Sequence, residues 1–213
     1  MYALALSSVT AAAVITPQSA IAQNNTTTTT TDVFERSVTP EGTTDPKVLA
    51  NAPSPNIKVK GEAKTAKYVV DIRNNTLYKY DPNGQPLKAY LVATGMEYNR
   101  TKPGLRRVSH IEKSPFKYAP SWTKRRKNPR AYGKYVVILD IVDEKTGDLS
   151  SIGQFIHGNK DETSIGKKVS LGCMRMNNKV MNEEISQETK RGDYVLLMNP
   201  DPDWQKTKKK RGK

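Results

Sequence analysis

The sequence has one cysteine and two histidines among its 213 residues, and few long hydrophobic runs. A single cysteine excludes an intramolecular disulfide and every zinc or iron–sulfur site that needs several thiolates. Two histidines are too few for a histidine-rich metal cluster, so we expect neither a metal nor another cofactor. The main apolar run, residues 2–15, is shorter than the roughly 20 residues that span a bilayer as a helix.

That apolar run has the composition of an export signal. It contains no charged side chain and leads to Ala20-Ile21-Ala22, where small residues match the pattern that a signal peptidase cleaves. We therefore predict a signal peptide over residues 1–22, with no transmembrane anchor after its removal, and a location in the periplasm or cell wall. A buried apolar helix is the alternative, and Pro17 argues against it.

Polar, low-complexity composition continues to residue 63. Residues 26–31 are all threonine, four prolines follow, and apolar residues are few. We expect residues 23–63 to form a spacer that buries no core, either a linker that extends reach or a featureless leader. Residues 199–213 form a basic tail in which the last eight residues include six Lys or Arg. This tail is either simply solvated or adheres to an anionic wall or membrane surface.

Residues 64–198 are predicted to form one strand-rich domain. The β-rich runs lie at 67–72, 76–80, 87–94, 106–111, 135–142, 154–157 and 194–198. The first two flank Asn74-Asn75, which tolerates the positive φ of a tight turn, so they predict a hairpin. Only residues 177–189 have a helical pattern, with Asn177 or Asn178 as the N-cap. Short strands between frequent turns are typical of a mostly β sandwich or barrel, here with one or two short helices.

The candidate catalytic residues lie near the end of this domain, where His157 and Cys173 are 16 residues apart. A cysteine is a strong nucleophile only as thiolate, and its ordinary pKa of about 8.5 leaves little thiolate at neutral pH, so a histidine base would activate it. Gly172 would let backbone N–H groups approach a developing oxyanion. Arg175 falls on the same side of an extended segment as Cys173 and could hold a substrate carboxylate. Each residue alone also has a structural interpretation, such as a buried cysteine or a surface charge.

Residues 100–130 concentrate the positive charge, with eleven Lys or Arg against Glu112, in a protein whose formal net charge is +14. We expect a long loop or lid over the active face, with Trp122 and Tyr132 as aromatic substrate contacts. The segment is either a solvated charge run or a surface that captures an anionic polymer. Nucleic acid would fit the charge equally well, but the export signal and the Cys–His pair argue against it.

The order of these motifs resembles the signature of the L,D-transpeptidase catalytic domain, the YkuD-like family. The signature comprises HG at 157–158, IG at 165–166 and SLGCMRM at 170–176. The resemblance extends over residues 67–198, because the opening hairpin, VATG at 92–95 and TKPG at 101–104 follow in the family's order. Two positions depart from the family pattern: Lys102 is inserted in the turn, and Leu171 stands where many relatives have a second histidine.

The resemblance implies a sandwich-like catalytic domain that acts on peptidoglycan stem peptides. Cys173 would attack the carbonyl of the L-centre residue before a terminal D-Ala, expel D-Ala and hold the donor as a thioester. His157 would be the general base and later the acid, oriented by the Gly158 carbonyl. The N–H groups of Gly172 and Cys173 would form the oxyanion hole. Ser170 and Arg175 would shape and charge the pocket, and a carbapenem is the acylating ligand that the resemblance suggests.

Several alternatives stay open from the sequence. The acceptor is the side-chain amine of another stem or a lysine of an envelope protein, and if water replaces it the enzyme is an L,D-carboxypeptidase or endopeptidase. A different class of function is a non-enzymatic basic module that binds anionic wall polymer or nucleic acid, with Cys173 in a structural role. Reactivity of the thiol distinguishes the enzyme from the binding module.

Overall fold

The computed structural model describes residues 37–117, 131–200 and 202. The predicted signal peptide, most of the basic tail and residues 118–130 of the predicted lid lie outside this part of the chain. The strands are β1 (Asn56–Val59), β2 (Glu62–Thr65), β3 (Tyr68–Asp71), β4 (Thr76–Tyr80), β5 (Pro86–Leu91), β6 (Thr94–Gly95), β7 (Gly104–Lys113), β8 (Tyr135–Val142), β9 (Leu149–His157), β10 (Lys168–Ser170), β11 (Met174–Arg175) and β12 (Tyr194–Met198). The helical segments are α2 (Pro46–Leu49), η1 (Glu97–Asn99), η4 (Glu162–Ser164), α3 (Asn178–Val180), η5 (Met181–Ile185) and α4 (Ser186–Glu188). Among the described residues, no helix is both long enough and apolar enough to cross a membrane.

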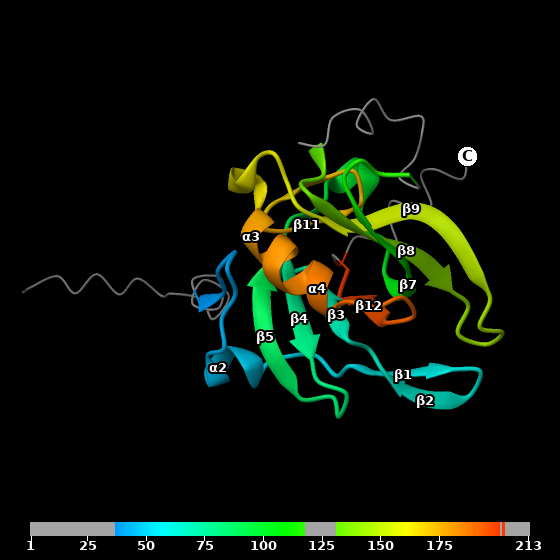
Figure 1. Ribbon diagram of the computed structural model, residues 1–213. Coiled ribbons are helices and arrows are strands. Elements are labelled where there is room, and N and C mark those ends of the chain that lie inside the picture. The colour runs from blue at the N-terminus through cyan, green and yellow to red at the C-terminus, as the bar shows by residue number, and fades with distance from the viewer. Residues whose placement is uncertain (1–36, 118–130, 201, 203–213) are drawn as a thin grey trace, which may run out of the picture.

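One eight-stranded sheet organises the domain, in the order β11-β9-β8-β7-β12-β3-β4-β5. It curls so that β7, β8 and β9 face β3, β4 and β5 like the walls of a half-barrel (Figure 1). The predicted hairpin is confirmed as antiparallel β3 and β4, with Asn75 in the turn at a φ of 50°. The C-terminal strand β12 closes the fold by pairing parallel to β3 and antiparallel to β7. The mostly β class with short helices is therefore confirmed. Because β7 lies inside this sheet, the expectation of a long loop or lid over residues 100–130 is wrong for residues 104–113.

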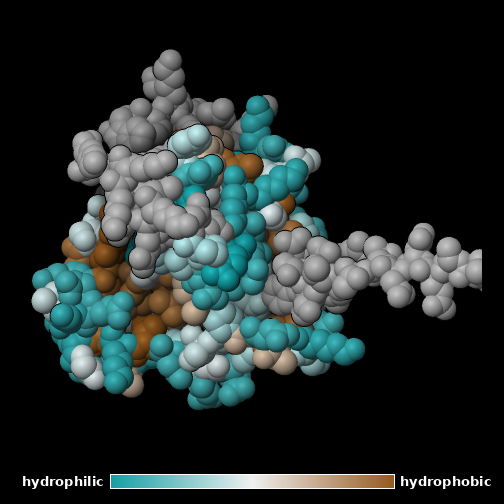
Figure 2. Space-filling model, turned by 180° about the vertical axis from the view of Figure 1, so that it is seen from behind, coloured by the Kyte–Doolittle hydropathy of each residue, from teal (hydrophilic) through white to brown (hydrophobic). Residues whose placement is uncertain are grey.

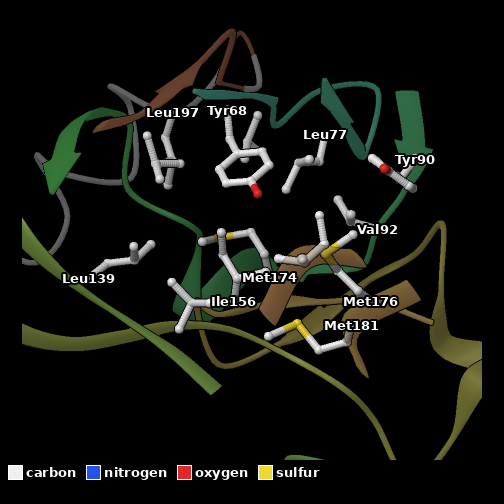
Figure 3. Close-up of a cluster of buried hydrophobic side chains, with 14 of the residues drawn as sticks. Tyr68, Leu77, Tyr90, Val92, Leu139, Ile156, Met174, Met176, Met181 and Leu197 are labelled. Carbon is white, nitrogen blue, oxygen red and sulfur yellow. The ribbon is translucent and has the colours of Figure 1, made fainter. Parts of the chain in front are cut away.

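The segment α3-η5-α4 fills the concave side of the curled sheet (Figure 1). Its start is fixed by Asn177, whose side chain accepts hydrogen bonds from the backbone N–H groups of Lys179 and Val180, as an N-cap does. Its apolar face packs against the inward side chains of both walls, as Figure 3 shows for Met181 beside the strand residues. The helix predicted over 177–189 is thus confirmed, with Asn177 as its cap.

Polar contacts also hold this helical segment against β5. Glu184 accepts hydrogen bonds from the Lys88 ammonium at 2.8 Å and from the Tyr90 hydroxyl at 2.7 Å. Burial by itself raises the pKa of Glu184. The hydrogen bonds from Lys88 and Tyr90, together with the charges of Lys88 and Lys79, outweigh burial and hold that pKa below its ordinary value. The ionised form is therefore favoured in the folded state.

Glu184→Gln should lower the free energy of unfolding at pH 7 by about 1 kcal/mol, as expected for a charge-assisted contact near the surface. A carboxyl whose pKa is lower in the folded state stabilises fully above its unfolded pKa, and this contribution fades as the pH falls through the folded pKa. The difference between variant and parent should therefore shrink in acid, as urea unfolding from pH 7 to pH 3 would measure. Glu183→Gln, an exposed neighbour, is the matched control. A difference that stays constant down to pH 3 would contradict this account.

The expectation that residues 23–63 bury no core is wrong for the described part, residues 37–63. Val38, Val48, Ile57 and Val59 are all buried in a second hydrophobic cluster on the outer face of the sheet. Backbone hydrogen bonds also join Thr43 to Ala89 and thereby cover edge strand β5. The structured unit therefore begins well before residue 64. A few apolar residues are enough to bury this segment, because the outer face of the sheet provides the apolar side chains against which they pack.

The hairpin of β1 and β2 borders a groove of about 720 Å³ beside β12. Ile57 and Ala63 of the hairpin and Leu196 of β12 supply apolar lining, and Lys58 and Glu144 supply charge. Figure 2 shows apolar surface gathered in a hollow on this side of the molecule. The N-terminal segment thus covers only part of the apolar outer face of the sheet.

Candidate active site

His157 and Cys173 line one cavity of about 220 Å³ at the end of β9 and the start of β11. The two residues come from sequence segments that meet because β11 pairs parallel to β9, with Arg175 opposite His157 and Met174 opposite Ile156. The full lining is Ala131, His157, Asn159, Lys160, Asp161, Ser170, Leu171, Cys173 and Arg175. The sheet therefore assembles the predicted nucleophile, base and cationic residue at one site.

Alternation along the two strands explains which side chains face this cavity. Ile156 and Met174 are fully buried in the main core, where Figure 3 shows them close together. Because successive side chains of a strand point to opposite faces, the neighbours His157, Cys173 and Arg175 are directed away from that core. Packing of two apolar side chains thus fixes the register that brings base and thiol to the same cavity.

The imidazole of His157 is almost completely buried and held on two sides. Its Nδ1 lies 2.5 Å from the Gly158 carbonyl oxygen. A carbonyl can only accept, so Nδ1 carries the proton of the neutral ring and Nε2 is the basic nitrogen. The Tyr132 ring packs edge-on against the imidazole, with centroids 4.9 Å apart and an interplanar angle of 87°. The tautomer and the ring plane are both set by the surroundings.

The backbone that follows His157 is held by Asn178 at the start of α3. Its Nδ2 donates to the Asn159 carbonyl at 2.6 Å, and its Oδ1 accepts from the Asn159 N–H at 2.9 Å. Close packing leaves no room for a side chain here: a Cβ on Gly158 would lie 2.4 Å from that Oδ1, and one on Gly133 would lie 2.9 Å from the Gly158 Cα. The Gly158 carbonyl that orients the imidazole is thus immobilised by the helix.

The loop before Cys173 differs from the expectation. Ser170 is buried, and its hydroxyl donates to the Cys173 carbonyl at 2.6 Å while accepting the Gly172 N–H at 3.0 Å. The Gly172 N–H therefore points to Ser170, and its predicted role as an oxyanion donor is wrong for this conformation. Gly172 has a φ of 112°, a value that few other residues adopt. Glycine at this position therefore suits the turn that leads into Cys173, while its N–H is occupied by Ser170.

Charged groups of both signs line the cavity. A hydrogen bond from the Thr163 hydroxyl holds the pKa of Asp161 below its ordinary value, and the nearby positive charge of Arg175 adds to this effect. Asp161 is therefore ionised at neutral pH beside Arg175 and Lys160. Among the described residues, no group of three or more His, Cys, Asp and Glu is placed to hold a metal ion.

The predicted aromatic contacts have different outcomes. Trp122 lies outside the described residues, so its predicted role stays a prediction. Tyr132 is 4% exposed and does not line the cavity. Its ring packs against His157 and Phe155. The predicted contact with substrate is therefore wrong in this structure, and Tyr132 instead supports the imidazole ring. Leu171, at the position where many relatives have histidine, is 52% exposed at the cavity.

Sequence reasoning missed several residues around the site, among them Asn159 in the cavity wall and Asn178 behind it. It also missed Arg106 and Gln154, two buried polar residues on β7 and β9. Gln154 stands next to Phe155 and Ile156 at the buried end of its strand, where the burial pattern changes from exposed to buried. A polar side chain in a buried stretch of strand needs a hydrogen-bonding partner. A glutamine directly before the apolar residues Phe155 and Ile156 was therefore the sequence feature that could have marked Gln154.

Comparison with protein families gives one match, to the L,D-transpeptidase catalytic domain (YkuD), over residues 65–197. The match covers more than half of the chain and contains every described residue of the candidate site. The chain belongs to this family. Membership agrees with the resemblance seen in the motifs and with the half-barrel fold of this L,D-transpeptidase domain. A search of curated proteins finds no match.

Solved structures with a similar fold show low sequence identity to this L,D-transpeptidase domain. The structure of Bdellovibrio bacteriovorus Bd1075 is 15% identical with a TM-score of 0.50, and the match covers 76% of this chain and 60% of that one. A cysteine-to-serine mutant of Enterococcus faecium L,D-transpeptidase is 19% identical with a TM-score of 0.44, over 62% of this chain and 49% of that one. An L,D-transpeptidase from Mycobacterium tuberculosis H37Rv is 17% identical with a TM-score of 0.45, over 62% and 56%. The chain thus spans about half to three fifths of the length of these proteins.

Proposed function

We propose that this protein is an exported cysteine L,D-transpeptidase that acts on peptidoglycan stem peptides in the periplasm or cell wall. The observation that supports this proposal most directly is that His157 and Cys173 line the same cavity in a domain of this family. A thiol and an oriented imidazole are sufficient for acyl transfer without a cofactor. The positive charge of Arg175 and Lys160 in the same cavity suits a substrate that bears carboxylates.

In the first half of the reaction His157 Nε2 takes the proton of the Cys173 thiol, and the thiolate attacks the carbonyl carbon of the L-centre residue that precedes the terminal D-Ala. A carbon–sulfur bond forms, and the carbonyl oxygen becomes an oxyanion. The carbon–nitrogen bond to D-Ala then breaks, and the imidazolium returns its proton to the leaving amine. The product is a thioester between Cys173 and the donor stem.

In the second half an amine attacks the thioester, His157 accepts its proton, and the Cys173 thiolate leaves and is reprotonated. The acceptor is the side-chain amine of another stem, which gives a crosslink between peptides, or a lysine of an envelope protein. Transfer to an amine requires that water be poorly placed at the thioester. We propose that residues 114–130 of the predicted lid, with Trp122, contribute this shielding and that their positive charge draws in the anionic wall polymer.

Incubation of the protein with a tetrapeptide muropeptide and a free D-amino acid should exchange the terminal D-Ala for the added residue, as mass analysis of the muropeptides would detect. Cys173→Ala should abolish the exchange, and Ser150→Ala, on an exposed stretch of β9, should leave it unchanged. Tripeptide and free D-Ala as the sole products, even with abundant amine, would identify an L,D-carboxypeptidase instead. No turnover, together with an unreactive thiol, would favour the non-enzymatic binding module.

A further inference from the structure

The carbonyl oxygen of Gly172, in the peptide bond that joins it to the nucleophile, accepts two hydrogen bonds from side chains. Gln154 Nε2 donates to it at 2.9 Å and Thr101 Oγ1 at 3.2 Å. In a planar trans peptide the C=O of one residue and the N–H of the next point in opposite directions. Holding the Gly172 carbonyl toward Gln154 and Thr101 therefore also fixes the direction of the Cys173 N–H, away from them.

Gln154 is itself oriented by a buried arginine. Arg106 Nε donates to Gln154 Oε1 at 2.7 Å, and the other guanidinium nitrogens donate to the carbonyls of Leu105 at 3.0 Å and Lys102 at 2.8 Å. A guanidinium only donates, so the amide oxygen of Gln154 must face Arg106. The amide nitrogen is then directed to the Gly172 carbonyl, and the opposite amide orientation is excluded.

Packing alone does not account for the presence of Arg106. The side chain is 2% exposed, and its hydrogen bonds to described residues go to uncharged oxygen atoms. Burial lowers its pKa to about 10, so it is still a cation at neutral pH. A buried cation is costly unless its donors are satisfied, and here the hydrogen bonds of Arg106 go to the Lys102 carbonyl before β7, the Leu105 carbonyl at its start and the Gln154 side chain. This cost points to a role in orienting the polar groups next to the nucleophile.

We propose that Arg106 and Gln154 are positioning residues for the oxyanion hole: through the Gly172 carbonyl they aim the Cys173 N–H at the oxyanion of the tetrahedral intermediate. This inference rests on the proposed acyl transfer. It explains how the site provides an oxyanion donor although the Gly172 N–H is used by Ser170. It also requires that the two residues matter for steps with a tetrahedral oxyanion and not for the nucleophilicity of the thiol.

Two reactions of the same thiol separate these effects. Acylation by a carbapenem passes through a tetrahedral oxyanion, whereas alkylation by iodoacetamide displaces iodide from a saturated carbon and forms none. Gln154→Glu keeps the length of the side chain and its contact with Arg106, but it presents an oxygen to the Gly172 carbonyl. In the full chain we expect acylation of Cys173 to slow by roughly 10–100-fold, somewhat less than the loss of an entire oxyanion donor. Alkylation should change by less than about threefold.

Thr101→Val removes the second donor to Gly172 and should slow acylation in the same selective way, which keeps the test valid if Gln154→Glu folds poorly. Arg107→Gln, an exposed arginine beside Arg106 on β7, is the matched control and should change neither rate. Equal slowing of both reactions, or unchanged acylation in both variants, would overturn the positioning role while leaving the proposed function intact. If the unmodified chain is not acylated at all, the proposed function fails first and the inference with it.

Discussion

His157→Ala should slow acylation of Cys173 by a carbapenem by roughly 10²–10⁴-fold, the usual contribution of a positioned general base. The thiol would lose the group that takes its proton, while the oxyanion donor and the cavity walls stay in place. Intact-protein mass spectrometry over time gives the rate directly, because each acylation adds one ligand mass to a chain with a single cysteine. The effect should be largest below pH 8, where an unassisted thiol is mostly protonated.

The protein offers a matched control for this experiment, because His110 on β7 is its other histidine. His110→Ala removes the same group at a position outside the cavity lining and should leave the acylation rate within about twofold. If His157→Ala reacts as fast as the parent, His157 is not the base. If neither protein forms an adduct, Cys173 is structural and the binding-module alternative is favoured.

Sequence patterns located the strands well where both faces of a strand are buried or nearly so. The bounds of β8 and β12 agree with the predicted 135–142 and 194–198, because these runs are dense in β-branched and other apolar residues and end at polar or turn residues. The hairpin of β3 and β4 was equally predictable, since Asn75 marks its turn locally. In these segments the decisive information lies within a few residues of the chain.

The packing of residues 37–63 could not be predicted in that way. Val38, Val48, Ile57 and Val59 stand singly or in short apolar stretches between polar residues and prolines, so the local composition resembles a disordered spacer. Their burial depends on partners far along the sequence, such as Tyr78 and Val142. The composition of a segment shows how many apolar side chains it contains. It does not show whether other parts of the fold offer an apolar surface on which those side chains can pack.

The candidate site likewise has features that the sequence reveals locally and features that depend on tertiary contacts. Cys173 and His157 were identified from residue type and motif order, which are properties of the sequence itself. The direction of the Gly172 N–H depends on a hydrogen bond to Ser170, and the Gly172 carbonyl depends on Gln154 and Thr101. The direction of this carbonyl is therefore determined by tertiary contacts between loops and strands. The motif therefore predicted which side chains meet in the cavity, and the prediction failed for the Gly172 N–H, whose direction is set by its hydrogen bond to Ser170.

A chain that begins at Lys64 should be several kcal/mol less stable than the full chain, although it contains the whole family match and the whole candidate site. Burial of one Val or Ile side chain contributes about 1.5–3 kcal/mol, so losing Val38, Val48, Ile57 and Val59 removes up to roughly 6–12 kcal/mol. Compaction of the unfolded chain reduces that figure, but it is still comparable with the 5–15 kcal/mol by which whole domains are stable. We expect the shortened chain to be largely unfolded or aggregated, since edge strand β5 and the part of the sheet's outer face that residues 37–63 cover would both become exposed.

Point substitutions in the full chain test the same contact without truncation. On β1, side chains alternate between buried and exposed, so Ile57→Ala should cost about 2–5 kcal/mol and the adjacent Lys58→Ala less than about 0.5 kcal/mol. Urea unfolding at fixed pH gives both differences from the shift in midpoint. A chain that starts at Lys64 and unfolds within about 1 kcal/mol of the full chain would show that the N-terminal segment is dispensable. His157 and Cys173 are held in place by the inner core. Such a result would therefore also show that β9, β11 and the helical segment α3-η5-α4 are enough to keep the site intact.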